Sequence, residues 1–180
     1  MVFADLDRAR RERRTVMTDG PSDSDKTAEP PPSSELKPKL LAFARDFPFF
    51  RHMGFEVEDM EPGYARVAVE LTDHLRNPNG QMHGGVIATL VDMSITQAML
   101  MTDTYERVRE TRGIMTNIDL RMKYLRAVGA GRATVESRIV HEGRRVVHAA
   151  STVTDDRGKT VALGDATLMI VQGEGTKKKT

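Results

Sequence analysis

The sequence predicts an α+β domain in which an antiparallel β-sheet wraps around one central α-helix. The first observation is an almost wholly apolar segment at residues 84–101, which has the length and composition of a helix that is buried on all sides. The second is that two β-patterned segments precede it and four follow it, most of them separated by tight turns. Strands joined by tight turns pair antiparallel, and a helix that is apolar all round needs a sheet to cover it.

Composition limits the class of protein. A chain of 180 residues is expected to hold one domain that needs no disulfide or metal to fold, and the absence of cysteine fits a reducing compartment. The net charge of +1 does not indicate a nucleic-acid partner. No uncharged apolar run reaches the roughly 18 to 20 residues of a membrane span, and early charges exclude a signal peptide. We therefore expect a cytoplasmic protein with no membrane or nucleic-acid partner.

The two ends differ from the domain between them. Residues 1–34 contain a Pro-, Ser- and Asp-rich segment, which predicts a disordered tail. The basic run Arg8–Arg14 in this tail favours a solvated segment over a site for an anionic surface, because it has no aromatic residues. We expect a globular domain at residues 35–172 and a flexible end at residues 173–180.

The domain is expected to begin with a helix and a hairpin. In SSELKPKLLAFARDFPFF a serine precedes a helical apolar period, Pro38 fits the first turn of a helix, and Pro48 is expected to end it. The segments GFEVEDM and YARVAVEL predict two strands around a turn at residues 61–63.

Four strands are expected after the central helix. The segment IMTNIDLRMKYL alternates with a period of two, so it predicts a strand with one buried face and one polar face. The segments RATVESRIV and RRVVHAASTVTD flank a turn at residues 142–143, and a hairpin loop at residues 155–158 leads to the last strand, TVALGDATLMIV. The expected buried face carries Ile114, Thr116, Ile118, Leu120, Met122 and Tyr124, and the expected polar face carries Asn117, Asp119, Arg121 and Lys123.

The expected central helix carries a single formal charge, Asp92, among mostly apolar neighbours. A buried carboxylate is unfavourable unless it is paired or hydrogen-bonded, so Asp92 has either a chemical role or a structural one as a cap or ion-pair partner. His83, Gly84 and Gly85 stand at the helix start, where free N–H groups and the helix dipole could form an oxyanion hole. A glycine pair that only shapes a turn would look the same in sequence.

Asp92 and the helix start cannot serve one site within one chain. Asp92 lies eight residues after Gly84, which is about 12 Å along the helix axis. A general base must come within roughly 3 Å of its target. If both act in one site, the sequence predicts that Asp92 comes from a second subunit, packed antiparallel across a twofold axis.

The pattern around the helix start resembles that of hotdog-fold acyl-CoA thioesterases of the phenylacetate-pathway (PaaI) type. The residues that carry the resemblance are Asn77, Gly80, His83, Gly84, Gly85, Leu90 and Asp92. The resemblance covers roughly residues 50–171. It implies a hotdog fold and hydrolysis of an acyl- or aryl-CoA thioester to a free acid and CoA. It also implies a homo-oligomer, either a dimer or a dimer of dimers (a homotetramer).

The resemblance assigns a role to each matching residue. Asp92 would be the general base or, less favoured, the nucleophile at the thioester carbon. The backbone N–H of Gly84, helped by Gly85, would polarise the thioester oxygen. Asn77 would orient water or substrate, and His83 would position the loop or the thioester.

One family position departs from the usual pattern. Family members often place a water-holding Ser or Thr early in the strand after the helix, where this chain has Thr116 and Asn117. Asn117 is favoured because the expected alternation places it on the polar face with Asp119 and Arg121.

Basic residues are expected to contact the phosphates of CoA. The candidates lie at predicted strand ends, where an ordinary solvated surface is an equally good explanation; they are Lys123, Arg126, Arg144 and Arg145. No metal site is expected from the histidine spacing and no resident cofactor is expected, because no nucleotide-binding loop motif occurs.

Two other functions compete with a thioesterase. A non-catalytic hotdog protein that binds or senses acyl-CoA remains the alternative, although residues 1–34 are too short and polar for a helix-turn-helix. A hydratase or dehydratase would need a histidine and a carboxylate in a different motif. The acyl group is not specified, because Met93, Met99 and Met101 indicate an adaptable apolar pocket.

Overall fold

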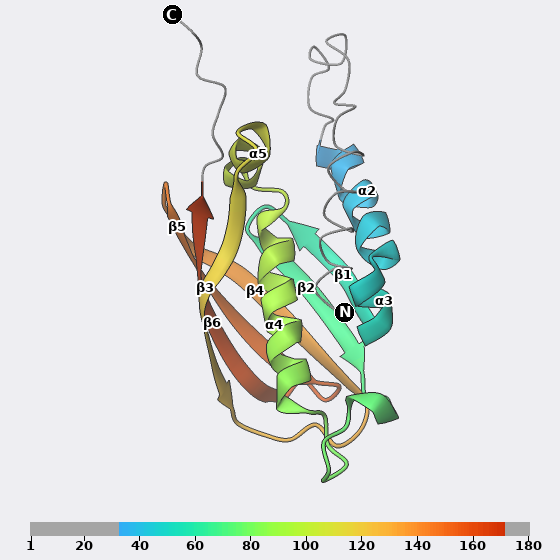
Figure 1. The fold of residues 1–180 in the computed structure, drawn as a ribbon. Coiled ribbons are helices and arrows are strands. Elements are labelled where there is room, and N and C mark those ends of the chain that lie inside the picture. The colour runs from blue at the N-terminus through green and yellow to red at the C-terminus, as the bar shows by residue number, and fades with distance from the viewer. Residues whose placement is uncertain (1–32, 172–180) are drawn as a thin grey trace, which may run out of the picture. The chain divides into compact units, whose positions relative to one another are not determined.

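A computed structural model describes residues 33–171, so the two predicted tails, including the run Arg8–Arg14, lie outside the described residues except for the helical residues 33 and 34. Figure 1 shows the arrangement of the elements. In chain order they are α2 (Ser33–Asp46), α3 (Pro48–Met53), β1 (Phe55–Glu61), β2 (Tyr64–Glu70), the 3-10 helix η2 (Asp73–Leu75), α4 (Gly84–Met99), α5 (Asp103–Glu110), β3 (Ile114–Tyr124), β4 (Arg132–Glu142), β5 (Val146–Asp155) and β6 (Thr160–Val171).

The six strands form one antiparallel sheet in the order β1-β2-β4-β5-β6-β3. The sheet curves around α4, which packs mainly on β2 and β4 (Figure 1). Strands β1 and β3 are the two edges. The predicted architecture, an antiparallel sheet wrapped around one helix, is therefore confirmed.

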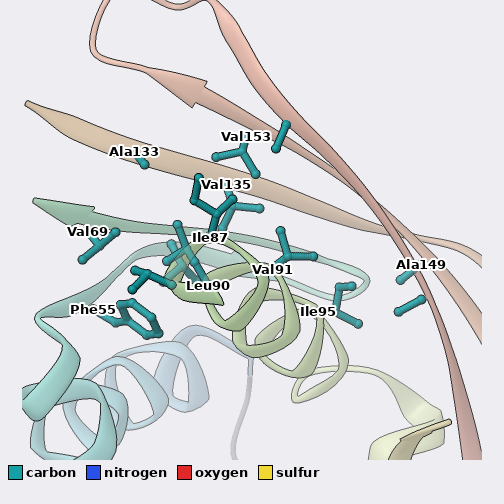
Figure 2. Packing of buried hydrophobic residues seen from close by; sticks show 14 of the residues in the cluster. Phe55, Val69, Ile87, Leu90, Val91, Ile95, Ala133, Val135, Ala149 and Val153 are labelled. Carbon is teal, nitrogen blue, oxygen red and sulfur yellow. The ribbon is translucent and has the colours of Figure 1, made fainter. Parts of the chain in front are cut away.

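The core lies between α4 and the sheet, as Figure 2 shows from close by. Leu90, Val91 and Ile95 of α4 are fully buried against strand residues such as Val135 and Val153. Burying each such side chain contributes roughly 1.5 to 3 kcal/mol. The opposite face of the sheet is charged, and its cross-strand pairs include Arg132 with Glu56 and Glu58 at 2.8 and 2.7 Å.

The N-terminal helix differs in detail from the prediction. Pro38 lies inside α2, beyond its first turn, because the helix already begins at Ser33. The helix ends before Pro48 as expected, but Pro48 also starts a second helix, α3, that was not predicted. Both helices lie beside β1 (Figure 1). Lys37 of α2 hydrogen-bonds Asp59 of β1, and this bond lowers the pKa of the Asp59 carboxyl.

Helix α5 was also missed, although the sequence contains its signals. The predicted central helix ends at residue 101, whereas α4 ends at Met99 and a new helix begins at Asp103. The Thr102 side chain caps it by accepting a hydrogen bond from the Tyr105 N–H, and acids in its first turn and arginines in its last turn complement the helix dipole. Among the described residues no single helix is long and apolar enough to cross a membrane; only α4 and α5 together pass that test, with an 83° bend between them.

A β-bulge in β3 overturns the predicted alternation in the first part of the strand, whereas Leu120 and Met122 after the bulge pack against the core as predicted. The pairing with β6 shifts between Asn117 and Asp119, and the extra residue reverses which side chains face the core. Ile114 and Ile118, predicted to be buried, are 61% and 53% exposed. Asn117 pairs with the buried Leu168 and faces α4, whereas Asp119 pairs with Thr167 on the opposite face. The premise that Asn117 shares a face with Asp119 and Arg121 was therefore wrong.

Candidate active site

The first turn of α4 is held by the histidine that precedes it. His83 is the N-cap, and its Nδ1 accepts a hydrogen bond from the Gly85 N–H at 2.9 Å. The Gly85 N–H is therefore already engaged. The Gly84 N–H has no acceptor among residues 33–171. Of the two glycines, only Gly84 presents a free donor at the positive end of the helix dipole.

Asn77 shapes the loop that leads into this helix. Its side-chain Oδ1 accepts hydrogen bonds from the N–H groups of Asn79 and Gln81, at 2.9 and 3.1 Å. Gly80 adopts a φ of +77°, a left-handed conformation that favours glycine. The Arg76 guanidinium group stabilises the same loop by donating a hydrogen bond to the carbonyl of Gly80. The Asn77 carboxamide oxygen thus fixes the shape of the loop.

A cavity of about 360 Å³ lies at this helix start. Asn77, Gly84 and Arg126 line it, so the structure brings together three of the predicted site residues. Tyr124 also lines it, and its hydroxyl donates a hydrogen bond to the Gly84 carbonyl at 2.9 Å. A Cβ on Gly84 would lie 3.4 Å from the Tyr124 ring. Tyr124 was not among the predicted site residues, because the regular alternation suggested only a core role for it.

Asp92 is half-buried in the middle of α4, where Asn117 Nδ2 donates a hydrogen bond to its Oδ1. Asn117 Oδ1 is buried and has no hydrogen-bond partner among the described residues. No arginine or lysine of residues 33–171 forms an ion pair with Asp92. Within one chain, Asp92 is therefore held by an amide and not by a cation.

The two halves of the site lie along the same edge strand. β3 runs antiparallel to α4, so its last residue, Tyr124, contacts Gly84, whereas Asn117 contacts Asp92 two helix turns further on. The arrangement keeps the carboxylate and the free N–H of one chain about 12 Å apart. Both halves lie beside an edge strand whose outer side pairs with no other strand of residues 33–171.

The four basic candidates do not form one cluster within the chain. Arg126 lines the cavity beside Gly84, and Lys123 is an exposed residue of β3 that precedes Tyr124. Arg144 and Arg145 precede Val146, which pairs with Met169 of β6, whereas Tyr124 pairs with Ala162. Seven residues of β6 separate these positions, which is about 23 Å along the strand. A larger cavity of about 850 Å³ adjoins Arg144 at that distant end and contains none of the predicted catalytic residues.

The curved antiparallel sheet, the helix that begins with His83-Gly84-Gly85 and the acid within that helix define a hotdog-fold protein of the PaaI-type thioesterase class, as the sequence resemblance indicated. The chain belongs to the family described as "Domain of unknown function (DUF4442)", whose model matches residues 39–170.

Individual relatives support this assignment. The medium/long-chain acyl-CoA thioesterase YigI of Escherichia coli is 28% identical over 137 residues, which cover 71% of this chain and 88% of that protein. A variant of the phenylacetic acid degradation protein PaaI from Thermus thermophilus is 31% identical, with a TM-score of 0.58, over 68% of this chain and 97% of that one. The protein SSO1253 of Saccharolobus solfataricus is 32% identical over 98 residues; the match covers 54% of this chain and spans only 61% of the length of that relative.

Proposed function

We propose that this protein is an acyl-CoA thioesterase, which hydrolyses an acyl- or aryl-CoA to the free acid and CoA. The observation that carries the proposal is the pairing of a hydrogen-bonded carboxylate, Asp92, with a free N–H at Gly84, both beside the open edge of β3. The name of the relative YigI, a medium/long-chain acyl-CoA thioesterase, supports the same chemistry.

In the proposed reaction Asp92 acts as a general base. Asn117 fixes one carboxylate oxygen, which leaves the other to take a proton from water. The resulting hydroxide attacks the thioester carbon, and the negative charge that develops on the carbonyl oxygen is stabilised by the Gly84 N–H and the helix dipole. The C–S bond then breaks, and the CoA sulfur leaves as a thiolate or takes up the proton held by Asp92.

The remaining predicted residues act by positioning. His83 keeps Gly84 and Gly85 in the first turn through its bond to the Gly85 N–H. Asn77 sets the shape of the loop that borders the cavity, and its amide group is available to orient substrate. The unpaired Oδ1 of Asn117 is suited to accept a hydrogen bond from the attacking water.

We further propose that each site is built from two subunits. The exposed apolar side chains of Ile114 and Ile118 lie on the free edge strand β3, which suits antiparallel pairing with a second copy. Because Asn117 and Tyr124 mark the two halves of the site on that strand, a twofold axis between them would place Asp92 opposite Gly84 of the partner subunit. This arrangement removes the 12 Å separation within one chain.

The same symmetry gives the basic residues a common role. Antiparallel pairing of β3 would bring the end of one protomer that carries Arg144 and Arg145 toward the partner's helix start. There the CoA phosphates would also meet Lys123 and Arg126, since guanidinium and ammonium groups bind phosphate strongly. Dimerisation thus accounts for four cations that are far apart in one chain.

The deciding experiment measures CoA release from short, long and aromatic acyl-CoAs. Because the chain has no cysteine, a thiol-reactive dye reports only released CoA. Steady turnover that Asp92→Asn abolishes is the expected result. Tight acyl-CoA binding without turnover by the unchanged protein would instead indicate the alternative function, a non-catalytic acyl-CoA-binding protein.

A further inference from the structure

A third cavity, with a mostly apolar lining, is formed by residues of α2, α3 and β1. Its volume is about 660 Å³, within the range of about 300 to 1,000 Å³ that is usual for small-molecule sites. Its apolar lining includes Leu41 of α2, Phe50 of α3, and Phe55 and Val57 of β1. Phe50 and Phe55 are buried and contact each other edge to face, with ring centroids 5.9 Å apart, so this wall of the groove is well packed.

This groove is separate from the proposed catalytic site. It borders β1, whereas Asp92 and Gly84 lie beside β3, and these two strands are opposite edges of the sheet. Five strand spacings separate the edges, which is about 24 Å along the sheet. Pairing through β3 would leave the groove at the outer end of each subunit, so it cannot hold the acyl group of the thioester that is hydrolysed beside Asp92.

The rim of the groove is cationic. Arg45 and Arg51 both line it. Arg51 has no carboxylate partner among the described residues, and Arg45 approaches only the exposed Asp46, at 3.9 Å, which is a weak surface contact. Among the described lining residues the one acid is Glu56, and it is engaged by Arg132 at 2.8 Å. Within residues 33–171, two guanidinium groups therefore flank an apolar channel without a matching anion.

We propose that this groove binds a linear alkyl carboxylate, with its chain along Leu41, Phe55 and Val57 and its carboxylate on Arg45 and Arg51. An alkyl chain fits the apolar lining, and a carboxylate is the anion that a guanidinium group binds in a bidentate manner. A neutral or cationic amphiphile of equal length could occupy the apolar lining, but it has no carboxylate for Arg45 and Arg51 to bind. The proposal does not depend on thioester hydrolysis, although such acids are the products of that reaction.

A fluorescence titration tests the proposal, because the chain contains no tryptophan. Phe49→Trp places a single reporter beside Phe55, whose ring centroid lies 6.2 Å from that of Phe49. The full chain carrying this reporter is titrated with decanoate, decanol and decyltrimethylammonium, each below its micelle-forming concentration. We expect saturable binding of decanoate that is at least about tenfold tighter than that of the other two, because only decanoate can accept charge-assisted hydrogen bonds from the two guanidinium groups. Equal affinities for all three would overturn the proposal.

Matched variants locate the ligand. Arg45→Gln with Arg51→Gln should weaken decanoate binding at least about tenfold, whereas Arg157→Gln, in an exposed hairpin loop, should leave it unchanged. Ala42→Phe, which fills the groove from α2, should abolish binding while the melting temperature stays close to that of the reporter protein. Asp92→Asn should bind decanoate normally. Loss of binding in Asp92→Asn but not in Ala42→Phe would place the ligand in the catalytic site and refute the groove.

Discussion

Asn117 on the edge strand β3 donates a hydrogen bond from its side-chain amide to Oδ1 of Asp92, in the middle of α4. This bond exists because the β-bulge after Asn117 turns its side chain toward the helix. The bond holds one carboxylate oxygen in place but leaves the carboxylate of Asp92 negatively charged. A group that takes up a proton needs this charge. The second oxygen and the unpaired Oδ1 of Asn117 are left to bind water.

Removing this amide should impair chemistry more than folding. A hydrogen bond to a charged group is worth roughly 1.5 to 3 kcal/mol, so Asn117→Ala should lower kcat by about 10-fold to 100-fold. Thr116→Ala is the matched control, because Thr116 is the neighbouring residue and is exposed. Steady-state kinetics on both variants decide between the two candidates for holding water. A larger loss in Thr116→Ala would move that role to Thr116.

The proposed oxyanion donor, the Gly84 N–H, can be deleted without disturbing the helix. Gly84 is the first residue of α4, and its predecessor His83 has φ −63° and ψ 135°, an extended conformation that a following proline accepts. Gly84→Pro therefore removes the N–H while keeping the helix start. Loss of one such donor should lower kcat by about 10²-fold to 10³-fold.

Gly84→Ala is the control for that experiment. It keeps the N–H and adds a Cβ at 3.4 Å from the Tyr124 ring, an ordinary contact distance. Near-normal turnover in Gly84→Ala together with a large loss in Gly84→Pro assigns the role to the N–H. Equal losses in both variants would instead indicate that the space beside Tyr124 matters, and the oxyanion role of Gly84 would be refuted.

Much of the fold could be predicted, because apolar periodicity and turn residues are local signals. The six strands and α4 all have such signals, and α5 has a Thr102 cap that could have been recognised. The bulge in β3 could not be predicted, because it depends on pairing with β6, far along the chain. Asn117 was thus selected as a site residue for an incorrect reason. The distance between Lys123 and Arg144 could not be predicted either, because it depends on the register of the paired strands.

The free edge of β3 should be the subunit interface. Ile118→Lys places a charge on an exposed apolar position of this edge and should reduce the oligomer to monomers. Turnover should be lost with assembly, because each site as proposed needs two chains. Analytical ultracentrifugation and kinetics measure both effects. Val140→Lys, at a position 63% exposed on β4, is the control and should leave mass and activity unchanged.

Complementation provides a stricter test of a site shared between subunits. Asp92→Asn and Gly84→Pro should each be inactive, but a hybrid dimer contains one site with an intact Asp92 and an intact Gly84. Equal amounts, unfolded together and refolded, should recover about a quarter of wild-type activity, because half the dimers are hybrids and each has one of two sites. No recovery, with mixed dimers demonstrated by mass spectrometry, would place both residues in a single-chain site or outside catalysis.

The decisive substitution is Asp92→Asn. It preserves the size of the side chain, and its carboxamide oxygen can still accept the hydrogen bond from Asn117. It removes the base, so kcat should fall by roughly 10²-fold to 10⁴-fold. KM should change little, because Asp92 is not proposed to bind CoA.

If Asp92 were only structural, the substitution would lower the melting temperature or break the oligomer, and the folded fraction would turn over normally. Melting temperature, oligomer mass and kcat measured on one preparation separate these outcomes. A stable oligomer with a near-wild-type kcat would end the assignment of Asp92 as the base.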